Sequence, residues 1–432
     1  MQSNLESASV TITDAPLAGR AARGGVLVLG GGFAGAYVAR QLGRNGATIV
    51  NPTNFMLYTP LLPEAAAGNI EPRHVVVPLR TMCPHADLVL GCAVAHDPER
   101  RVVEVQSEAG RIAISYEKLV IALGSVTRIP AVPGLREHAL GLKDLGDAIR
   151  LRNHVLRQIE LADAAPHSAA RRLTFVVAGA GFSGVEAIAE VSEMAEEALC
   201  NHPRLAHVRP RWVLVDAGAR ILGQTPDGLA RFAARTLSRR GIVIITDTRL
   251  TAVDPEGVQL SDGGRIATET VVWTAGVTAN RIVGALGLPV EERGRVEVDE
   301  TLRVVGQEHI WSLGDCAAVP NLATPGVTDP PTCQHALRQA RRLSKNLRGT
   351  PKPYRFRSLG HMATLGRRHG IAVVAGVRLR GIAGWAFARG YHVLQLPFAA
   401  RRARVIADWA AAAFFRRDLA ELSIPSTSER AA

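Results

Sequence analysis

Two glycine-rich turns in this sequence have the spacing needed to bind the pyrophosphate groups of two dinucleotides. The first turn follows the apolar run at 26–29, the second follows the apolar run at 175–178, and each leads into a helical pattern. Glycines allow a tight turn and a close approach to a pyrophosphate, whose charge then lies against free N–H groups at the helix N-terminus. The glycines concerned are Gly30, Gly32, Gly35, Gly179, Gly181 and Gly184.

The repetition of this motif carries more weight than either copy. A single copy often marks only a tight turn and no nucleotide site. Both copies here, however, follow a buried-type strand and begin a helix. They lie about 150 residues apart, which is the width of one domain. A duplicated nucleotide fold has a direct chemical use, because a flavin in one site and a nicotinamide in the other can stack for hydride transfer. The sequence therefore predicts an α/β fold with two Rossmann-like dinucleotide-binding domains.

The residue that ends the second strand of each predicted domain distinguishes the two sites. In the second copy this residue is Asp216, whose carboxylate can accept hydrogen bonds from both ribose hydroxyls and repels a 2′-phosphate. This favours NADH over NADPH. In the first copy the residue is Asn51, and the lost charge-assisted bond costs about 1 kcal/mol. We therefore expect FAD to bind there roughly tenfold more weakly than it would beside a carboxylate.

Length and composition describe a globular chain that suits an anionic surface. With 432 residues, of which 47% are hydrophobic and 21% charged, the chain exceeds one ordinary core and is not extensively disordered. The formal net charge is +12, and arginines gather toward the C-terminus. Few aromatic residues are interleaved with them, so we expect an anionic membrane surface and no nucleic acid partner. The alternative explanation of the high arginine content is a compositional bias of the genome, without any role in binding.

The cysteines and the chain ends indicate a protein of the reducing cytosol. The five cysteines are scattered without a CxxC pair, so the sequence predicts neither a disulfide framework nor a metal site. Residues 1–23 lack the apolar run of a secretory signal, and no run of 18 apolar residues predicts a spanning helix. We expect residues 1–23 and 423–432 to be disordered.

Further motifs resemble those of the type II NADH:quinone oxidoreductases, the single-subunit, FAD-containing respiratory dehydrogenases of the pyridine nucleotide-disulfide oxidoreductase superfamily. The segment at 57–64, Leu-Tyr-Thr-Pro-Leu-Leu-Pro-Glu, is similar to the family's loop beside the flavin. The segments at 119–125 and 271–277 resemble the strands and small-residue turns that follow each nucleotide domain. The segment at 310–315 is similar to the second FAD motif, whose Asp holds the ribityl or pyrophosphate region. The resemblance thus implies cofactor contacts at Pro60, Leu61, Ala122, Gly124, Ala275, Gly276, Gly314 and Asp315.

The resemblance also implies two residues at the site of electron transfer. Glu186 matches a family glutamate near the nicotinamide and the flavin, and we expect it to position the carboxamide of NADH, although the helix dipole alone also favours a carboxylate there. Gln334 matches the quinone-site motif, in which an amide hydrogen-bonds a quinone carbonyl. Cys333 and Arg338 depart from that motif, and a solvated helix face is the alternative reading.

The order of the motifs implies a glutathione-reductase-like arrangement. Residues 24–140 and 290–352 would form the FAD-binding domain, and the NADH-binding domain, 141–289, would be inserted between them. Pro130 and Gly134 mark the outward crossing.

Residues 353–422 form a separate unit, which we expect to be helical. Its last helical pattern places Val405, Ile406, Trp409 and Ala413 on one face, with arginines on either side. Such a stripe suits a helix in a bilayer surface, and the resemblance favours this reading, although a docked or dimerising helix has the same pattern. We expect peripheral attachment to the cytoplasmic face of the cell membrane, with a homodimer as the other assembly.

The resulting hypothesis is hydride transfer from NADH to FAD and then electron transfer to a membrane quinone, without proton pumping. A soluble NAD(P)H-dependent flavin reductase acting on a disulfide, ferredoxin or other small acceptor has the same fold. Disulfide chemistry needs paired cysteines, which Cys316 and Cys333 could supply only if the fold brings them together. A flavin-poor nucleotide-binding paralogue is the remaining alternative, because of Asn51.

Overall fold

A five-stranded parallel sheet forms the centre of the first α/β unit. The computed structural model describes residues 18–422, and in it the strands of this sheet run in the order β22, β10, β2, β3, β6. Strands buried on both faces are nearly continuous in apolar residues, and all four residues of β2 are buried. The sheet consists of β2 (Val26–Leu29), β3 (Ala47–Asn51), β6 (Ala86–Leu90), β10 (Lys118–Ile121) and β22 (Ile310–Ser312).

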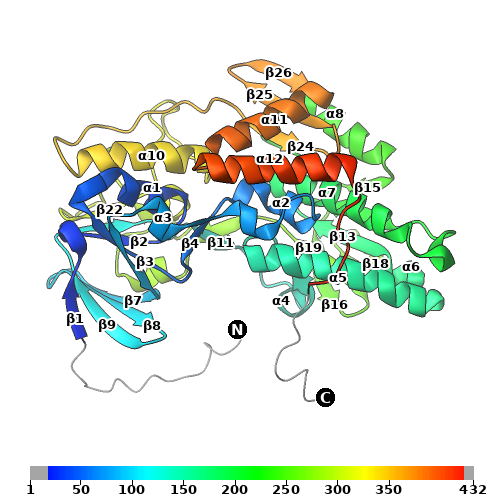
Figure 1. Cartoon of the computed structure of the whole chain (residues 1–432), viewed down its shortest axis with the longest axis horizontal. Coiled ribbons are helices and arrows are strands. Elements are labelled where there is room, and N and C mark those ends of the chain that lie inside the picture. The colour runs from blue at the N-terminus through cyan, green and yellow to red at the C-terminus, as the bar shows by residue number, and fades with distance from the viewer. Residues whose placement is uncertain (1–17, 423–432) are drawn as a thin grey trace.

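Two helices that are far apart in the sequence cover this sheet. Helix α1 (Phe33–Leu42) and helix α10 (Cys333–Asn346) pack against each other, and their apolar residues join the core that includes β2 (Figure 1). Thr332 caps α10 by accepting a hydrogen bond from the backbone N–H of His335.

The second α/β unit repeats this plan. Its parallel sheet has the order β12, β19, β13, β14, β15. Asp144 and Asp147 form a capping box at the start of the long helix α5, which fixes where the chain enters this unit. The elements are β12 (Ala139–Leu140), β13 (Thr174–Ala178), β14 (Arg211–Val215), β15 (Ile242–Ile245), β19 (Thr270–Trp273), α5 (Leu145–Ala164), α7 (Phe182–Leu199) and α8 (Asp227–Arg239).

The second unit is inserted into the first. Strand β22 follows the whole second unit in sequence, yet it pairs with β10 of the first sheet. The chain crosses out along β11 (Ser125–Thr127) and returns along β20 (Val277–Ala279), and these two strands pair as an antiparallel ribbon. The predicted fold class, two Rossmann-like domains with one inserted in the other, is confirmed.

Smaller sheets and short helices complete the two units. A four-stranded sheet flanks the first unit, and its edge strand β1 (Ala18–Ala21) pairs with β9, so regular structure begins earlier than residue 24. The expected disorder of residues 1–23 is therefore wrong for 18–21, while 1–17 and 423–432 lie outside the described residues. The remaining elements are β4 (Phe55–Leu57), β5 (Val76–Pro78), β7 (Cys92–Asp97), β8 (Val102–Ser107), β9 (Gly110–Ser115), β16 (Leu250–Asp254), β17 (Gly257–Leu260), β18 (Arg265–Ala267), β21 (Val296–Glu297), β23 (Ala317–Ala318), α2 (Leu62–Ala66), α3 (Leu79–Met82), α4 (Leu135–His138), α6 (Ala169–Arg172) and α9 (Ile282–Ala285).

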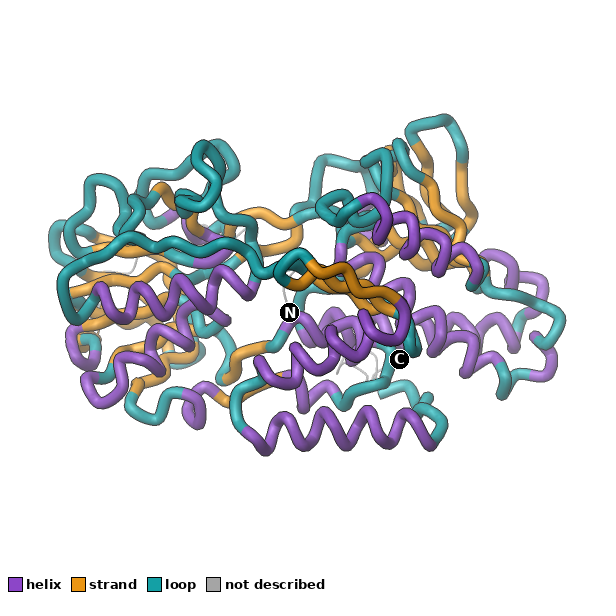
Figure 2. Tube along the Cα trace, turned by 90° about the horizontal axis from the view of Figure 1, so that it is seen from above, coloured by secondary structure: helices purple, strands orange, loops and turns teal. Residues whose placement is uncertain are grey.

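The C-terminal unit contains a sheet as well as the expected helices. Three antiparallel strands precede helix α11 (Gly381–Gln395) and helix α12 (Ala399–Phe414). Seen from above, these strands and helices lie over the middle of the molecule, between the two α/β units (Figure 2). Among the described residues, no helix has the length and hydropathy that crossing a bilayer would require. The strands are β24 (Met362–Thr364), β25 (Gly370–Val374) and β26 (Val377–Arg380).

Two members of the apolar stripe predicted for α12, Val405 and Trp409, face the protein, whereas Ile406 and Ala413 are exposed. Val405 is 0% exposed, and it shares a small core with Tyr58 and Leu61, against which Trp409 also packs. The interpretation of Val405 and Trp409 as bilayer-facing residues is therefore wrong, because both complete a core of the first unit. Ile406 points the other way and is 52% exposed.

Candidate functional site

The first glycine turn joins β2 to α1, and each of its three glycines has its own steric reason. Gly30 has φ +103°, and a Cβ there would collide with the carbonyl of Ala122. A Cβ on Gly35 would collide with the carbonyl of Gly30, which keeps helix and strand in close contact. Gly32, at the N-cap of α1, would meet no atom within 4 Å. The turn is therefore closed by packing on two sides and open where a ligand would approach.

The second glycine turn, between β13 and α7, repeats this geometry. Gly179 has φ +105°, and a Cβ there would lie 2.7 Å from the backbone nitrogen of Ala275. A Cβ on Gly184 would collide with the carbonyl of Gly179, whereas one on Gly181 would meet nothing within 4 Å. The backbone of Ala275 thus packs against Gly179 as the backbone of Ala122 packs against Gly30. This close contact explains why a small-residue turn follows each domain.

The strand-end residues Asn51 and Asp216 make the same bond to their glycine turns. Asn51 Oδ1 accepts a hydrogen bond from the backbone N–H of Gly31 at 2.8 Å, and Asp216 Oδ2 accepts one from Ala180. The difference lies in the second polar atom. Asn51 Nδ2 donates to the carbonyl of Thr53 at 2.8 Å, whereas Asp216 keeps a carboxylate oxygen that accepts from Gly218. The asparagine therefore preserves the turn, but it places an amide donor where Asp216 has a second, charged acceptor.

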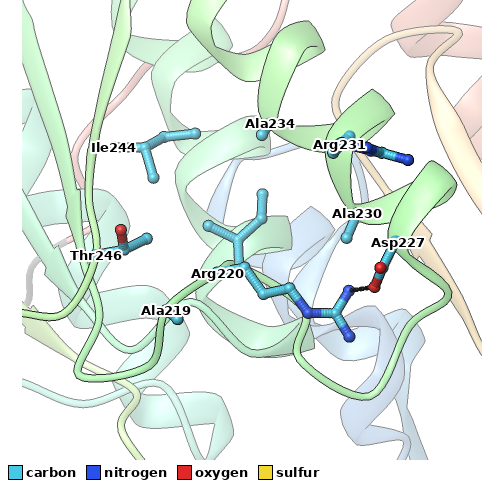
Figure 3. Close-up of a pocket in the computed structure, with 9 residues that line it drawn as sticks. Ala219, Arg220, Asp227, Ala230, Arg231, Ala234, Ile244 and Thr246 are labelled. Atoms are coloured by element: carbon cyan, nitrogen blue, oxygen red, sulfur yellow. Dashed lines mark ion pairs between the residues drawn. The ribbon is translucent and has the colours of Figure 1, made fainter.

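A cavity of about 400 Å³ lies beyond Asp216, between the loop after β14 and helix α8 (Figure 3). Arg220 stands at its side, paired with Asp227 at 2.8 Å, and also donates to the carbonyls of Gly223 and Thr225. The remaining walls are mainly apolar, so the cavity has the size and lining to take an adenine ring. Its residues are Ala219, Arg220, Ile221, Asp227, Ala230, Arg231, Ala234, Ile244 and Thr246.

Asp315 follows β22 and connects to the second unit through a short chain of hydrogen bonds. Ser125 donates to Asp315 Oδ2 at 2.7 Å, and Lys143 Nζ donates to Ser125 Oγ at 2.9 Å. Burial lowers the pKa of Lys143, and the Asp315 charge opposes this shift. Lys143 was not predicted from the sequence. The only feature of the sequence that marks Lys143 is its position just before Asp144, the N-cap residue of α5.

Gln339 fastens the turn that carries Asp315. Its Oε1 accepts from the backbone N–H of Gly314 at 2.8 Å, and its Nε2 donates to Asp329 at 2.9 Å. Gln339 is buried, so this amide of α10 has a structural role next to the predicted FAD contact.

The segment at 57–64 forms a buried loop between the two units. Leu61 is buried and Pro60 is half-buried. The hydroxyl of Tyr58 lies 3.3 Å from Nδ1 of His392, which comes from α11. Burial raises the pKa of Tyr58 well above its usual range and lowers the pKa of His392 to about 4, so both groups are neutral at physiological pH.

Glu186 lies in the first turns of α7, two residues after Gly184. Its Oε1 accepts a hydrogen bond at 3.0 Å from the backbone N–H of Thr364, so the C-terminal sheet reaches the predicted NADH turn. Burial raises the pKa of Glu186 to about 8, with further contributions from the charges of Glu190 and Glu64. The sequence assigned no role to these two buried neighbours.

Gln334 lies in the first turn of α10 and is tied to the C-terminal unit. Its Nε2 donates to the carbonyl of Gly360 at 3.0 Å, and its Oε1 is buried without a hydrogen-bond partner among the described residues. Arg338 lies over the Phe356 ring at 4.1 Å. The predicted site residues thus form three groups: the first turn with Asp315, the second turn with Asp216 and Glu186, and Gln334 below the C-terminal unit.

The cysteines offer no reactive thiol at this site. Burial raises the pKa of Cys333 to about 11 and also raises the pKa of Cys316. Cys316 Sγ donates to the carbonyl of Leu313 at 3.4 Å, and all five cysteines are free. Because the thiolate is the reactive form, burial disfavours reactivity of these two thiols.

The chain belongs to the pyridine nucleotide-disulphide oxidoreductase family, whose model matches residues 24–340. Within that family, the predicted resemblance to type II NADH:quinone oxidoreductases is confirmed. The chain is 29% identical over 391 residues to the type II NADH:quinone oxidoreductase Ndh of Mycobacterium tuberculosis, covering 86% of this chain and 84% of that protein. It is 28% identical over 408 residues to the demethylphylloquinone reductase NdbB of Synechocystis, covering 90% and 96%.

The fold also matches a solved structure along nearly its whole length. NDH2 from Plasmodium falciparum in complex with NADH superposes with a TM-score of 0.84 at 17% identity, over 91% of this chain and 99% of that one. The two open glycine turns fit FAD and NAD(H), since each presents helix N-terminal amides where a side chain would otherwise stand.

We predict that Gly181→Val raises the KM for NADH about tenfold or more without unfolding the protein. The new side chain would occupy the space left for the pyrophosphate, and a loss of about 1.4 kcal/mol in binding is a factor of ten. Steady-state kinetics and thermal unfolding check this. Gly284→Val in α9, another glycine with no atom within 4 Å of a Cβ, is the control. An unchanged KM in the Gly181 variant would contradict the assignment of this turn to NADH.

Proposed function

We propose that the protein is an FAD-dependent enzyme that takes a hydride from NADH and passes the electrons to a membrane quinone without pumping protons. The observation that carries this proposal is the packing of α2, which ends the loop beside the predicted flavin site, against α7, which opens the predicted NADH turn (Figure 1). The two sites therefore share one boundary. Relatives named as NADH:quinone oxidoreductases support the donor and the acceptor.

The protein residues supply binding, orientation and exclusion of water. Bound FAD supplies the two-electron carrier between a hydride donor and a quinone. The first turn, Asn51 and the hydrogen-bonded group of Asp315, Ser125 and Lys143 would hold this cofactor. The second turn and Asp216 would hold NADH, with its adenine in the cavity beside α8 and Glu186 at its carboxamide.

Gln334 is the residue we assign to the acceptor. Its buried Oε1 can accept a hydrogen bond from a quinol hydroxyl, and rotation of the amide would present Nε2 to a quinone carbonyl instead. Arg338 stacks on Phe356 next to it, so an apolar ring and an amide face the same region.

Anaerobic titration of the purified holoprotein tests this function. We expect NADH to bleach the flavin absorbance with one equivalent per FAD, and a short-chain quinone to restore it. A protein that binds no FAD would leave a nucleotide-binding role. A flavin reduced by NADH that ferredoxin reoxidises, and quinone does not, would favour the soluble reductase.

Asp216 should set the preference between the two nicotinamide donors. We predict that Asp216→Asn lowers the ratio of kcat/KM for NADH to that for NADPH about tenfold, because it removes both the charge-assisted ribose bond and the repulsion of a 2′-phosphate. Kinetics with both donors measure the ratio. Asp262→Asn, an exposed aspartate in the same unit, should leave it unchanged.

We also propose peripheral binding to the cytoplasmic face of an anionic membrane through the outer face of the C-terminal helices. Large apolar side chains of α11, α12 and the residue that follows α12 are exposed, including Phe414, which is 84% exposed. Arginines lie among them and can meet lipid phosphates. The exposed apolar residues are Ile382, Leu394, Ile406, Phe414 and Phe415, and the exposed arginines nearby are Arg404 and Arg416.

The double variant Ile406→Glu, Phe414→Glu should lose most binding to vesicles that contain anionic lipid. Each buried side chain of this size contributes about 1.5–3 kcal/mol, so two charges in their place should reduce the bound fraction at least about tenfold. Co-sedimentation measures this, with Leu161→Glu on α5 as the exposed apolar control. Full retention on vesicles would contradict the proposal, and a wild-type dimer that the double variant dissociates would assign this face to a second copy of the chain.

A further inference from the structure

Three buried or half-buried carboxyl groups meet where α2, α7 and the C-terminal helices converge. We call Glu64, Glu186 and Glu190 the glutamate cluster. Glu64 is 3% exposed and Glu190 is 1% exposed. The charge of Glu64 raises the pKa of both Glu186 and Glu190. Removing a charge from water is costly unless a partner compensates it, so the partners of each member determine which groups can be ionised.

Glu64 is paired directly with a cation, and the charge of Arg389 opposes the rise in pKa that burial causes. Its Oε2 accepts from Arg389 Nη2 at 2.9 Å and from the indole N–H of Trp409. The guanidinium of Arg389 lies 4.6 Å from the ring centres of both Trp385 and Trp409. This carboxylate is therefore compensated by a cation that two indole rings hold in place.

Glu190 has no cation in direct contact. Its Oε2 accepts from Asn69 Nδ2 at 2.8 Å, and its Oε1 is buried without a hydrogen-bond partner among the described residues. Arg417 donates to the other side of Asn69, and its guanidinium is already paired with Glu197 at 2.8 Å and Glu193 at 3.5 Å. A neutral carboxylic acid suits these surroundings better than a carboxylate.

Glu186 lies one helical turn before Glu190 on the same face of α7. Its backbone partner is Thr364, four residues after Gly360, whose carbonyl accepts from Gln334, so one short segment holds both Glu186 and the amide assigned to the acceptor. Burial raises the pKa of both Glu186 and Glu190 to about 8, and the negative charge of Glu64 adds to the shift of each. The two carboxyls thus lie one helical turn apart, and for both of them the shift favours the neutral form.

We propose that Glu190 is a proton reserve that recharges Glu186 during reduction of the acceptor. This inference rests on the proposed function. A hydride brings two electrons and one hydrogen, whereas conversion of a quinone to a quinol takes up two electrons and two hydrogens. The second hydrogen must arrive as a proton.

The proton moves in two steps that balance. The O–H bond of Glu186 breaks as an O–H bond forms on the acceptor, which leaves Glu186 as a carboxylate. The O–H bond of Glu190 then breaks as that of Glu186 re-forms, and water finally returns a proton to Glu190. The groups that face Glu190 during this cycle are Glu64 on α2, Glu186 and Glu193 on α7, Arg389 on α11 and Arg417 beyond α12, and the two arginines stabilise the transient carboxylate.

Glu190→Gln in the holoenzyme tests the reserve, because glutamine keeps the size and the bond to Asn69 but releases no carboxyl proton. At pH 7 we expect unchanged bleaching by NADH and an unchanged first reoxidation by quinone. Steady-state quinone turnover should fall at least about tenfold, since Glu186 is recharged slowly after each cycle. Glu196→Gln, an exposed carboxylate on the same helix, should stay within about twofold of wild type.

The outcomes separate a proton reserve from a structural role and from failure of the proposed function. Equal losses in the first and later turnovers would make Glu190 structural and overturn the inference, as would a steady-state rate like that of Glu196→Gln. A wild-type protein that quinone cannot reoxidise would refute the proposed function instead. In wild type, a pH indicator in weak buffer should record proton uptake after quinol formation, and simultaneous uptake would overturn the reserve even if Glu190→Gln failed to fold.

Thermal unfolding gives a readout independent of turnover. The folded-state pKa of Glu190 is raised above that of the unfolded chain, so its contribution to stability is complete below about pH 4.5 and is lost as pH rises through about 8. The unfolding temperature of Glu190→Gln should therefore fall less than that of the wild type between pH 5 and pH 9. Parallel curves would show that Glu190 holds no proton there.

Discussion

The buried ion pair between Glu64 and Arg389 is the interaction on which the arrangement of this molecule depends. Glu64 belongs to the loop beside the predicted flavin site, and Arg389 lies on α11, 325 residues further along the chain. Breaking a buried pair by removing one partner typically costs about 3–5 kcal/mol, because the remaining charge is left without compensation in a medium that solvates it poorly. The pair therefore holds the C-terminal helices against α2, and α2 in turn packs against α7. The ion pair and this packing therefore fix the predicted flavin loop, in the first unit, relative to the predicted NADH turn, in the second.

The C-terminal unit is consequently part of the site as well as a surface. Thr364 holds Glu186, Trp409 holds Glu64, and the carbonyls of Asp418 and Ala420 accept hydrogen bonds from Arg152 on α5. A membrane contact on the outer face of α12 would lie on the opposite side of the same helix that closes the site. Displacing this helix would expose Glu64 and the apolar core around Tyr58, so attachment through the proposed face would be linked to the site by one helix.

Local sequence patterns predicted the elements whose causes are local. Each glycine turn requires a positive φ at its first glycine and close contact at its third, so both turns could be placed from the sequence alone. Trp409 was misread because an apolar stripe shows that a helix has a partner without showing which partner covers it. The resemblance implied a role for Glu186, but the meeting of Glu186 with Glu64 and Glu190 could not be predicted. The groups that compensate Glu64 come from helices more than 300 residues away, and a glutamate that is buried looks the same in sequence as one that is solvated.

The contrast between Asn51 and Asp216 follows from the different demands on the two sites. On the predicted FAD side, Asn51 keeps its bond to Gly31. Asp315, with the turn that Gln339 holds, gives a second place to bind the cofactor. The sequence near Asn51 does not indicate this second contact. A cofactor held at both ends tolerates the loss of one charge, because the remaining contacts are already in place when it binds. On the predicted NADH side the cavity beside α8 stays open, and the donor must enter and leave in every cycle. There the carboxylate of Asp216 is the charged group at the strand end that can select the ribose, so its charge matters more than that of its counterpart.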